Sequence, residues 1–431
     1  MIAPLPFPAA PEPTHGFPLR DGIVHGEEVP LPLIAREVGT PVFVYSASAM
    51  RQEARRLRSA LASLADPLIA YAVKANPNAA VLATLAREGL GADVVSGGEY
   101  RRARAAGVPP EKIVFSGVGK TAAEMALALD GGLCQFNLES LAEAEMLSAV
   151  ATALGRTAPV AFRVNPDVAA GSHAKISTGA AHNKFGIAIS EASTACARVR
   201  ELPGLRLCGF AVHIGSQLTS LAPLEEAFGK VGATIERLRR EGHDICTADL
   251  GGGLGIRYDP AAPRPPTPEA YGALVARVTR GWDVRLIFEP GRLIVGEAGV
   301  LLTEVIRVKP GPRHPFVILD AAMNDLMRPS LYDAWHEIDA VQPKADRMIA
   351  DVVGPVCETG DTFAVARPLE RVAAGELMII RTAGAYAASM GSTYNSRPLT
   401  PEVLVDGGNW AVIRPRQDIE ALLRERVPAW L

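Results

Sequence analysis

A single lysine, Lys74, ends a strongly apolar run that begins at Leu68 and is followed by a turn at Asn76-Pro77. At the end of a buried strand the amine of a lysine is partly desolvated, and it is then available as a nucleophile for an aldehyde or another carbonyl. The structural alternative is a lysine whose stem packs while its amine reaches water, and for an isolated lysine this is the more frequent case. The choice therefore depends on which other side chains the fold brings to this amine.

Polar residues and glycines follow several other apolar runs, and each has a structural alternative of its own. His213 could be a hydrogen-bonded core histidine, and Glu289 with Arg292 could form a surface ion pair. The glycines 251–253 do not match the GxGxxG pattern, but their consecutive backbone N–H groups suit a phosphate. The residues at the ends of these runs are Lys74, Asp93, Ser96, Arg163 with Asn165, His213 with Ser216, Gly251, Gly252 and Gly253, and Glu289 with Arg292.

The elements that position these residues alternate between short β-rich runs and helical stretches, which predicts a parallel sheet. Eight such runs within about 225 residues favour an α/β fold of the (β/α)8 TIM-barrel type over a doubly wound open sheet. In such a barrel the carboxyl ends of all strands share one mouth, so the residues named above would meet there. The predicted strands are 68–74, 92–96, 112–117, 134–140, 160–165, 209–216, 247–253 and 285–291.

The pattern changes after about Val295, where strand-like segments follow one another with little helix between them. We expect a second, mostly antiparallel β domain there, joined by a strand at 41–46 that follows a short helix and Gly39. The predicted domains are an N-terminal segment at 1–46 that joins the β domain, a barrel at 47–295 and the C-terminal β domain at 296–431. Within the last, strands are expected at 300–308, 315–320, 376–381, 402–406 and 410–415.

Composition excludes several function classes. The 431 residues are 48% apolar and 21% charged with a net charge of −3, which argues against nucleic acid or an anionic membrane surface as a partner. The five cysteines lack CxxC spacing, so neither a disulfide framework nor a zinc site is indicated, and we expect no metal. The N-terminus lacks the pattern of a secretory signal and no apolar run is long enough to span a membrane. A soluble cytoplasmic protein is expected.

One cofactor would use a lysine, a histidine, a glycine turn and a carboxylate at a common mouth. A lysine can bond to its aldehyde, a histidine can cover its flat ring, and glycines can hold its phosphate. A glutamate can keep its ring nitrogen protonated, which makes the ring an electron sink. The residues therefore indicate pyridoxal 5'-phosphate.

The motifs YAVKAN (71–76), HIGSQ (213–217), GGGLG (251–255) and EPGR (289–292) occur in this order. In this respect the chain resembles the barrel-type, alanine racemase-like pyridoxal phosphate enzymes. The resemblance implies that Glu289 distinguishes the decarboxylases of this group from its racemases, which carry arginine against the ring nitrogen.

Further motifs are similar to those of the diaminopimelate decarboxylases, and the resemblance extends from about residue 20 to the C-terminus. One departure is Thr359, where serine is commoner in the family. The motifs are MNDLMRP (323–329), LYDAWH (331–336), KISTG (175–179), NKFGI (183–187), CETGD (357–361) and GAYAASMGSTYNSRP (384–398).

The resemblance implies roles for individual residues. Lys74, Glu289, His213 and Cys357 would be catalytic, and Cys357 would donate a proton from the partner subunit of a homodimer with shared active sites. For the other four cysteines we expect buried, inert thiols. Arg292 and Arg328 would bind the distal carboxylate of the substrate, Glu358 its ammonium group, and Tyr332 and Tyr386 would supply hydroxyls. The cofactor-binding residues would be Lys74, His213, Ser216, Gly252, Gly253, Glu289, Pro290, Gly291, Arg292 and Tyr386.

The implied reaction is decarboxylation of meso-2,6-diaminopimelate to L-lysine and CO2, the last step of lysine biosynthesis. One alternative is a related decarboxylase for another amino acid with a carboxylate at its distal end. The other is a non-catalytic pyridoxal phosphate-binding protein. The small binding proteins of this superfamily lack a second domain, whereas this chain carries one with Cys357 and Arg328 in place.

Overall fold

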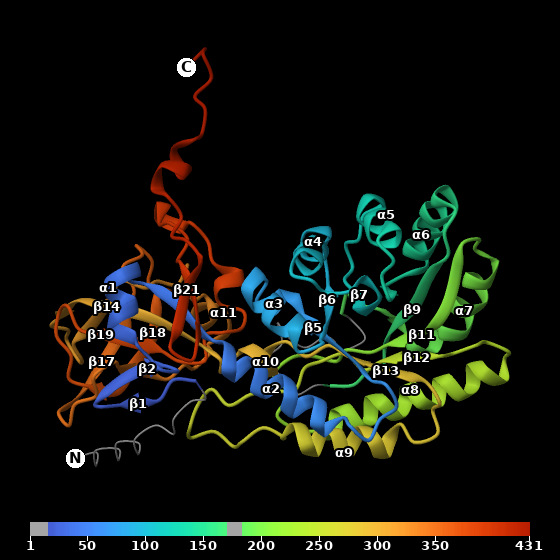
Figure 1. Cartoon of the computed structure of the whole chain (residues 1–431), viewed down its shortest axis with the longest axis horizontal. Coiled ribbons are helices and arrows are strands. Elements are labelled where there is room, and N and C mark those ends of the chain that lie inside the picture. The colour runs from blue at the N-terminus through green and yellow to red at the C-terminus, as the bar shows by residue number, and fades with distance from the viewer. Residues whose placement is uncertain (1–15, 170–182) are drawn as a thin grey trace. The chain divides into compact units, whose positions relative to one another are not determined.

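The computed structural model describes residues 16–169 and 183–431, which form two compact units (Figure 1). The barrel unit comprises the described residues of 51–256 and of 264–294. The β unit comprises residues 16–50, 257–263 and 295–431. Each unit has its own sheet and core, so each is described by itself. Within the described residues, no helix is both long and apolar enough to cross a membrane.

The barrel unit contains eight parallel strands that close on themselves, since β8 pairs with β9 at the seam. All eight predicted strands are present, so the barrel prediction is confirmed and the open-sheet alternative is wrong. A further short strand, β10 (Ile187–Ala188), pairs with β9 from outside the ring. The barrel strands are β5 (Leu68–Ala72), β6 (Gly91–Val94), β7 (Ile113–Phe115), β8 (Gln135–Leu138), β9 (Ala158–Asn165), β11 (Leu205–Ala211), β12 (Thr247–Asp249) and β13 (Arg285–Phe288).

Helices alternate with these strands, and Figure 1 shows α4, α5 and α6 in a row outside β6, β7 and β9. Several helices begin at a side-chain cap that satisfies a free backbone N–H. Ser96, expected among the chemical residues, is such a cap, because its hydroxyl accepts the N–H of Glu99 at 3.2 Å. The helices are α2 (Ala47–Ala60), α3 (Ala79–Arg87), α4 (Gly97–Ala105), α5 (Ala122–Asp130), α6 (Leu141–Leu154), α7 (Ala192–Glu201), α8 (Ala222–Arg240), α9 (Pro268–Val278) and α10 (Arg292–Val295).

The β unit is built on a mixed, mostly antiparallel sheet, as expected. Its N-terminal strand β4 (Val42–Ser46) pairs with β14 (Gly299–Lys309) and β20 (Glu402–Asp406), which confirms that the N-terminal segment joins this sheet. The β4–β20 and β15–β17 pairs are parallel. The other strands are β15 (Phe316–Leu319), β16 (Ile338–Ala340), β17 (Arg347–Val353), β18 (Thr362–Glu370), β19 (Leu377–Ile380) and β21 (Asn409–Arg414), of which β16, β17 and β18 were not predicted.

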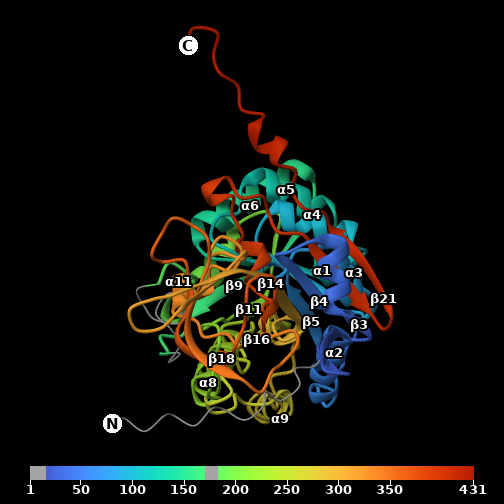
Figure 2. The same ribbon diagram turned by 90° about the vertical axis from the view of Figure 1, so that its left-hand side faces the viewer.

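The core of the β unit explains why β4 belongs to it. Every residue of β4 is buried, and Val42 and Val44 pack with Leu302 of β14 and Val403 of β20. Burial of such side chains stabilises the sheet by roughly 1.5–3 kcal/mol each. Helix α1 (Leu31–Val38) lies beside β3 (Val29–Pro30) on this unit (Figure 2). The remaining elements are β1 (Leu19–Arg20), β2 (Ile23–Gly26) and the short helix α11 (Arg328–Tyr332).

Candidate active site

Lys74 lies just after β5, in a single 3-10 turn at Val73–Ala75. Its amine does not simply point to solvent, because Nζ lies 2.8 Å from Oδ2 of Asp93 at the end of β6. The Asp93 side chain is completely buried, whereas that of Lys74 is 40% exposed. A buried carboxylate thus holds a lysine amine that ligands can still reach.

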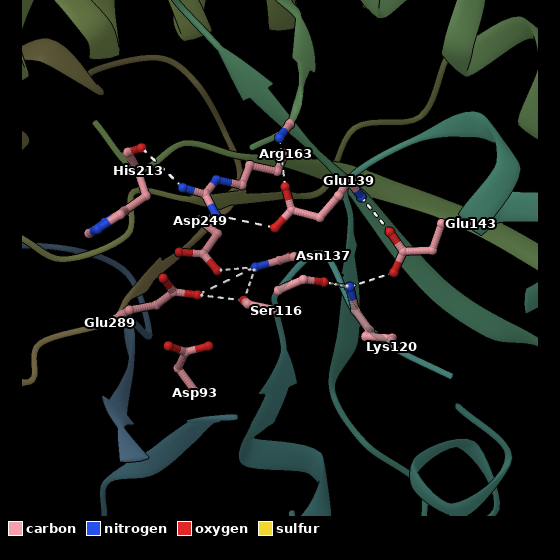
Figure 3. A network of polar contacts seen from close by, with 12 residues as sticks. Asp93, Ser116, Lys120, Asn137, Glu139, Glu143, Arg163, His213, Asp249 and Glu289 are labelled. Carbon is pink, nitrogen blue, oxygen red and sulfur yellow. Dashed lines mark hydrogen bonds and ion pairs between the residues drawn. The ribbon is translucent and has the colours of Figure 1, made fainter. Parts of the chain in front are cut away.

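Glu289 follows β13 directly, and its carboxylate lies within a buried polar network (Figure 3). The Ser116 hydroxyl donates to Glu289 Oε1 at 3.1 Å. The Asn137 amide donates to Asp249 Oδ2 at 2.8 Å and contacts Glu289 Oε1 at 3.4 Å. Two acidic side chains are therefore held side by side by neutral donors.

This crowding changes the proton affinity of both acids. Burial, and then the charges of Asp249 and Asp93, raise the pKa of Glu289 well above its usual value. Burial is also the main cause that raises the pKa of Asp249 to about 6. Glu289 therefore binds a proton readily when no cation lies against it, and a protonated ring nitrogen would serve as such a cation.

His213 follows β11 and is a neutral ring held at one edge. Its Nδ1 accepts the backbone N–H of Gly252 at 3.2 Å, which leaves the ring proton on Nε2. Burial, and then the positive charges of Arg163 and Lys74, lower the pKa of His213 well below 6.5. An uncharged, oriented imidazole is suited to lie against a flat ring.

The glycine turn after β12 has almost no room for side chains. A Cβ on Gly252 would lie 2.1 Å from the carbonyl oxygen of Glu289, and one on Gly253 would lie 2.2 Å from that of Gly215. Gly253 also has φ +107°, which disfavours other residues. Nearby, the Arg292 guanidinium donates to the Ser216 hydroxyl at 3.2 Å. The turn thus presents backbone beside a cationic side chain, a combination suited to a phosphate.

A second layer of buried charges supports this mouth, and the sequence analysis identified only one of its members, Arg163. Arg163 pairs with Glu139 at 3.2 Å and donates to the His213 carbonyl at 3.3 Å. Lys120, whose side chain is completely buried, pairs with Glu143 at 2.5 Å (Figure 3). Glu139 and Glu143 are joined through the backbone N–H of Glu139. The charges compensate one another, which offsets part of the cost of burying them.

The β unit carries the other predicted site residues. Arg328 is buried at the start of α11, and Tyr332 is half-buried at its end. Tyr386 is half-buried with φ +53°, a conformation that residues other than glycine seldom adopt. Backbone strain of this kind is often retained at ligand sites.

Cys357 and Glu358 are exposed on a loop that Asp361 holds together. The buried Asp361 carboxylate accepts the N–H groups of Met323 and Val356 at 2.6 and 2.7 Å. The Cys357 N–H donates to the Asn395 side chain at 3.1 Å. The thiol is therefore presented at the surface on a defined backbone.

The other four cysteines were expected to be buried and inert. Cys196 and Cys208 are buried, and burial raises the pKa of their thiols to about 12 and about 11. Cys134 is partly buried. For Cys246 the expectation is wrong, because this residue is exposed at the start of β12.

The structure thus brings the barrel-unit candidates together at one set of strand ends. The candidates on the β unit are described only within that unit, and the KISTG motif at 175–179 lies outside the described residues. Sequence reasoning missed Ser116, Asn137, Glu139 and Asp249, although polar residues inside apolar strand runs were the available signal. The barrel-unit candidates are Lys74, Asp93, His213, Ser216, Gly252, Gly253, Glu289, Pro290, Gly291 and Arg292, and those of the β unit are Arg328, Tyr332, Cys357, Glu358 and Tyr386.

These features fit pyridoxal phosphate. The mouth offers an accessible amine, a neutral ring in a fixed tautomer and a glycine turn that a Cβ would fill. It also offers a half-buried acid, Glu289, that binds protons readily. Among the described residues, no group of three or more histidines, cysteines and acids is placed to hold a metal ion.

Comparison with known proteins agrees with this fit. Residues 49–296 match the family model described as "Pyridoxal-dependent decarboxylase, pyridoxal binding domain". A diaminopimelate decarboxylase of Zymomonas mobilis is 56% identical over 96% of this chain and 99% of its own length. One of Neisseria meningitidis serogroup A is 47% identical over 91% of this chain and 96% of its own.

Solved structures give the same result. The diaminopimelate decarboxylase of M. jannaschii in co-complex with L-lysine matches with a TM-score of 0.93 and 35% identity, over 97% of this chain and 99% of its own. That of Helicobacter pylori complexed with L-lysine matches with a TM-score of 0.88 and 38% identity, over 91% of this chain and 98% of its own.

Proposed function

Because the chain belongs to the diaminopimelate decarboxylases, within the pyridoxal-dependent decarboxylases, we propose that it converts meso-2,6-diaminopimelate to L-lysine and CO2. This is the last step of lysine biosynthesis. The observation that carries the proposal is 56% identity over 96% of the chain, which includes both the barrel and the β unit. The β unit argues against a non-catalytic cofactor-binding protein, because it holds Arg328 and Cys357.

The barrel unit binds the cofactor, which when bound supplies a ring that accepts the electron pair left by departing CO2. Lys74 would bond to the aldehyde group, and Asp93 holds the amine of Lys74 in place. His213 would lie against the ring, and Glu289 would keep the ring nitrogen protonated. Gly252, Gly253, the backbone at Gly291 and the Tyr386 hydroxyl would hold the phosphate, and Ser216, Pro290 and Arg292 would be further cofactor-binding residues.

The surroundings of Glu289 raise its affinity for protons, which favours a proton on the ring nitrogen beside it. The Ser116 hydroxyl and the Asn137 amide fix the carboxylate in place. The adjacent Asp249 adds negative charge, which also favours a positive ring nitrogen. By holding a proton on the ring nitrogen, Glu289 would favour loss of CO2.

Cys357 returns a proton to the α-carbon, and it does so in the active site of the partner subunit of a homodimer. Exposure of Cys357 and Glu358 on a loop tied by Asp361 supports this role, since such a loop can reach beyond its own unit. We place this proposed homodimer in the cytoplasm.

Substrate choice rests on the distal amino acid centre. Arg328 and Arg292 bind its carboxylate, because guanidinium groups form paired hydrogen bonds with carboxylates. Glu358 binds the distal ammonium group, and the Tyr332 and Tyr386 hydroxyls complete the pocket. A decarboxylase for ornithine or lysine has no use for a carboxylate-binding arginine at this end.

The test is CO2 release from the purified, cofactor-loaded protein. Meso-diaminopimelate, L-lysine, L-ornithine and L-arginine are offered in parallel. Release from diaminopimelate alone, with L-lysine as product, is expected. No release from it, with the absorbance of bound cofactor intact, would overturn the substrate assignment and favour a decarboxylase for another amino acid with a distal carboxylate.

A further inference from the structure

A buried histidine of the β unit, His336, contacts the arginine assigned to the distal carboxylate. Its Nε2 lies 2.9 Å from a terminal nitrogen of Arg328. Its Nδ1 lies 2.8 Å from the carbonyl oxygen of Arg381, which follows β19. The exposed fractions of His336 and Arg328 are 1% and 6%. No role described above uses this histidine.

The two contacts define the protonation state of the ring. A carbonyl oxygen can only accept, so the Nδ1 of His336 carries the hydrogen. A guanidinium can only donate, so Nε2 presents its lone pair to Arg328. His336 is thus a neutral acceptor with one fixed tautomer, and it restrains one terminal N–H of Arg328.

Tyr258 fixes the plane of the same guanidinium. The Arg328 guanidinium carbon lies 4.2 Å from the centre of the Tyr258 ring, a cation–π contact. The Tyr258 and His336 rings meet edge to face, with centres 5.2 Å apart and planes at 75°. One aromatic ring therefore supports the face of the guanidinium while the other holds its edge.

Charged side chains of the same unit surround His336, and one of them contacts its backbone. Arg381 is paired with Asp339 at 2.5 Å. Arg367 donates to the His336 carbonyl at 2.7 Å and lies against the Trp335 ring at 4.2 Å. The hydrogen bond from Arg367 restrains the backbone of His336, and the ring nitrogen Nε2 contacts Arg328.

We propose that His336 and Tyr258 are positioning residues that orient Arg328 for the α-carboxylate at the distal end of the substrate. The proposal rests on the proposed function, in which Arg328 binds that group. A free arginine side chain loses conformational freedom when it binds a ligand, whereas one held in plane by a ring and a hydrogen bond has lost it already. The two residues therefore favour ligands that have this carboxylate over ligands that lack it.

Two ligands separate positioning from general structural support. In the proposed reaction L-lysine keeps the distal carboxylate, whereas cadaverine, its decarboxylated counterpart, has none. A fault in the positioning of Arg328 weakens binding of L-lysine and leaves that of cadaverine unchanged. A general loss of structure weakens the binding of both.

The experiment compares His336→Asn with His336→Gln in the cofactor-loaded protein. Asparagine can still donate to the Arg381 carbonyl but does not reach Arg328, whereas the glutamine side-chain oxygen can take the place of Nε2. We expect His336→Asn to raise KM for diaminopimelate and Kd for L-lysine about tenfold, the effect of losing one hydrogen bond to a charged group. His336→Gln should recover most of the lost affinity. In His336→Asn, kcat should change by a smaller factor than KM does.

Equal weakening of L-lysine and cadaverine in His336→Asn, or an unchanged Kd for L-lysine, would overturn the proposal. If His336→Asn does not fold, Tyr258→Leu removes the supporting ring and is judged by the same ratio of the two Kd values. CO2 release by the wild-type protein distinguishes a failure of the proposed function from a failure of this inference alone. Absence of CO2 release from diaminopimelate would overturn the proposed function and this inference together, whereas an unchanged ratio in variants of an active enzyme overturns this inference alone.

Discussion

The barrel mouth and the Cys357 loop both carry predicted catalytic residues, yet they are built in opposite ways. At the mouth, the buried Asp249 and the half-buried Glu289 are held by donors that lie on or directly after other strands. On the loop, Cys357 and Glu358 are exposed, and one buried carboxylate, that of Asp361, holds the backbone. The first region is fixed by its own unit, and the second is presented outward.

The difference implies different sensitivity to substitution. Residues of the mouth share their hydrogen bonds, so a change at one of them alters the proton affinity or position of the others. Residues on the exposed loop have few shared contacts, so a change there should alter catalysis with little effect on folding. The following predictions test this contrast.

The largest effect is expected for Lys74→Ala, which removes the amine that we assign to the cofactor aldehyde. Activity should fall by at least roughly 10³-fold, as for loss of a covalent catalytic group. The visible absorbance band of cofactor bound through Lys74 should disappear from the purified protein. The control is Lys112→Ala, which removes a half-buried lysine directly before β7 and should keep both the activity and the band. A retained band in Lys74→Ala would contradict the assignment.

Gly252→Ala tests whether the mouth tolerates added volume. The new Cβ would lie 2.1 Å from the Glu289 carbonyl oxygen, so the backbone must shift. We expect the free energy of unfolding to fall by about 1–3 kcal/mol, together with weaker cofactor binding. Gly229→Ala on α8 is the matched control, since nothing lies within 4 Å of its Cβ position. The control should be stabilised by about 0.5–1 kcal/mol, and equal losses in both variants would contradict the prediction.

The fold could be predicted where periodicity was strong. Alternation of β-rich and helical runs gave all eight barrel strands, and each observed strand overlaps its predicted range. The strands β16, β17 and β18 were missed, because residues such as Arg347, Asp351 and Arg367 interrupt their apolar pattern. Parallel pairing of β4 with β20 joins residues more than 350 positions apart, which no local pattern encodes.

The site could be predicted only in part, for a similar reason. Lys74, His213 and Glu289 stood out because each directly follows an apolar run. Asp249 is the last residue of β12 and Asn137 lies within β8. Their hydrogen-bond partners come from other strands. His336 lies within a recognisable motif, but its contact with Tyr258 depends on a segment about 80 residues earlier in the sequence. Contacts across a fold of this kind follow from tertiary structure and not from spacing.

A moderate effect is expected for Asp361→Ala, which leaves the Cys357 and Glu358 side chains unaltered but removes the acceptor for the N–H groups of Val356 on the loop and of Met323 beside it. We expect kcat to fall about tenfold, since displacement of the proton donor reduces the fraction of productive arrangements. Hydrogen exchange at 354–361 should become faster. The control is Asp346→Ala, whose carboxylate forms an exposed pair with Arg371 and should have little effect. Unchanged exchange in Asp361→Ala would show that other contacts hold the loop.

The smallest effect concerns the pH dependence of the mouth. Burial raises the pKa of Asp249 to about 6, above its value in the unfolded chain. Between about pH 4 and pH 6 the folded protein therefore binds more protons than the unfolded one, so the contribution of Asp249 to the free energy of unfolding falls as the pH rises. Glu289, whose pKa is also raised, contributes in the same direction.

Asp249→Asn removes one of these two acids and should flatten the pH dependence in cofactor-free protein. Relative to wild type, its melting temperature should rise by about 2–4 °C between pH 5 and pH 7.5, the shift that roughly 1 kcal/mol produces in a domain of this size. Asp346→Asn on the surface should follow wild type at each pH. Parallel curves for Asp249→Asn and wild type would mean that the two acids do not share the mouth as described. The contrast with the Cys357 loop would then rest on hydrogen bonding alone, because the charge of the buried pair would not affect folding.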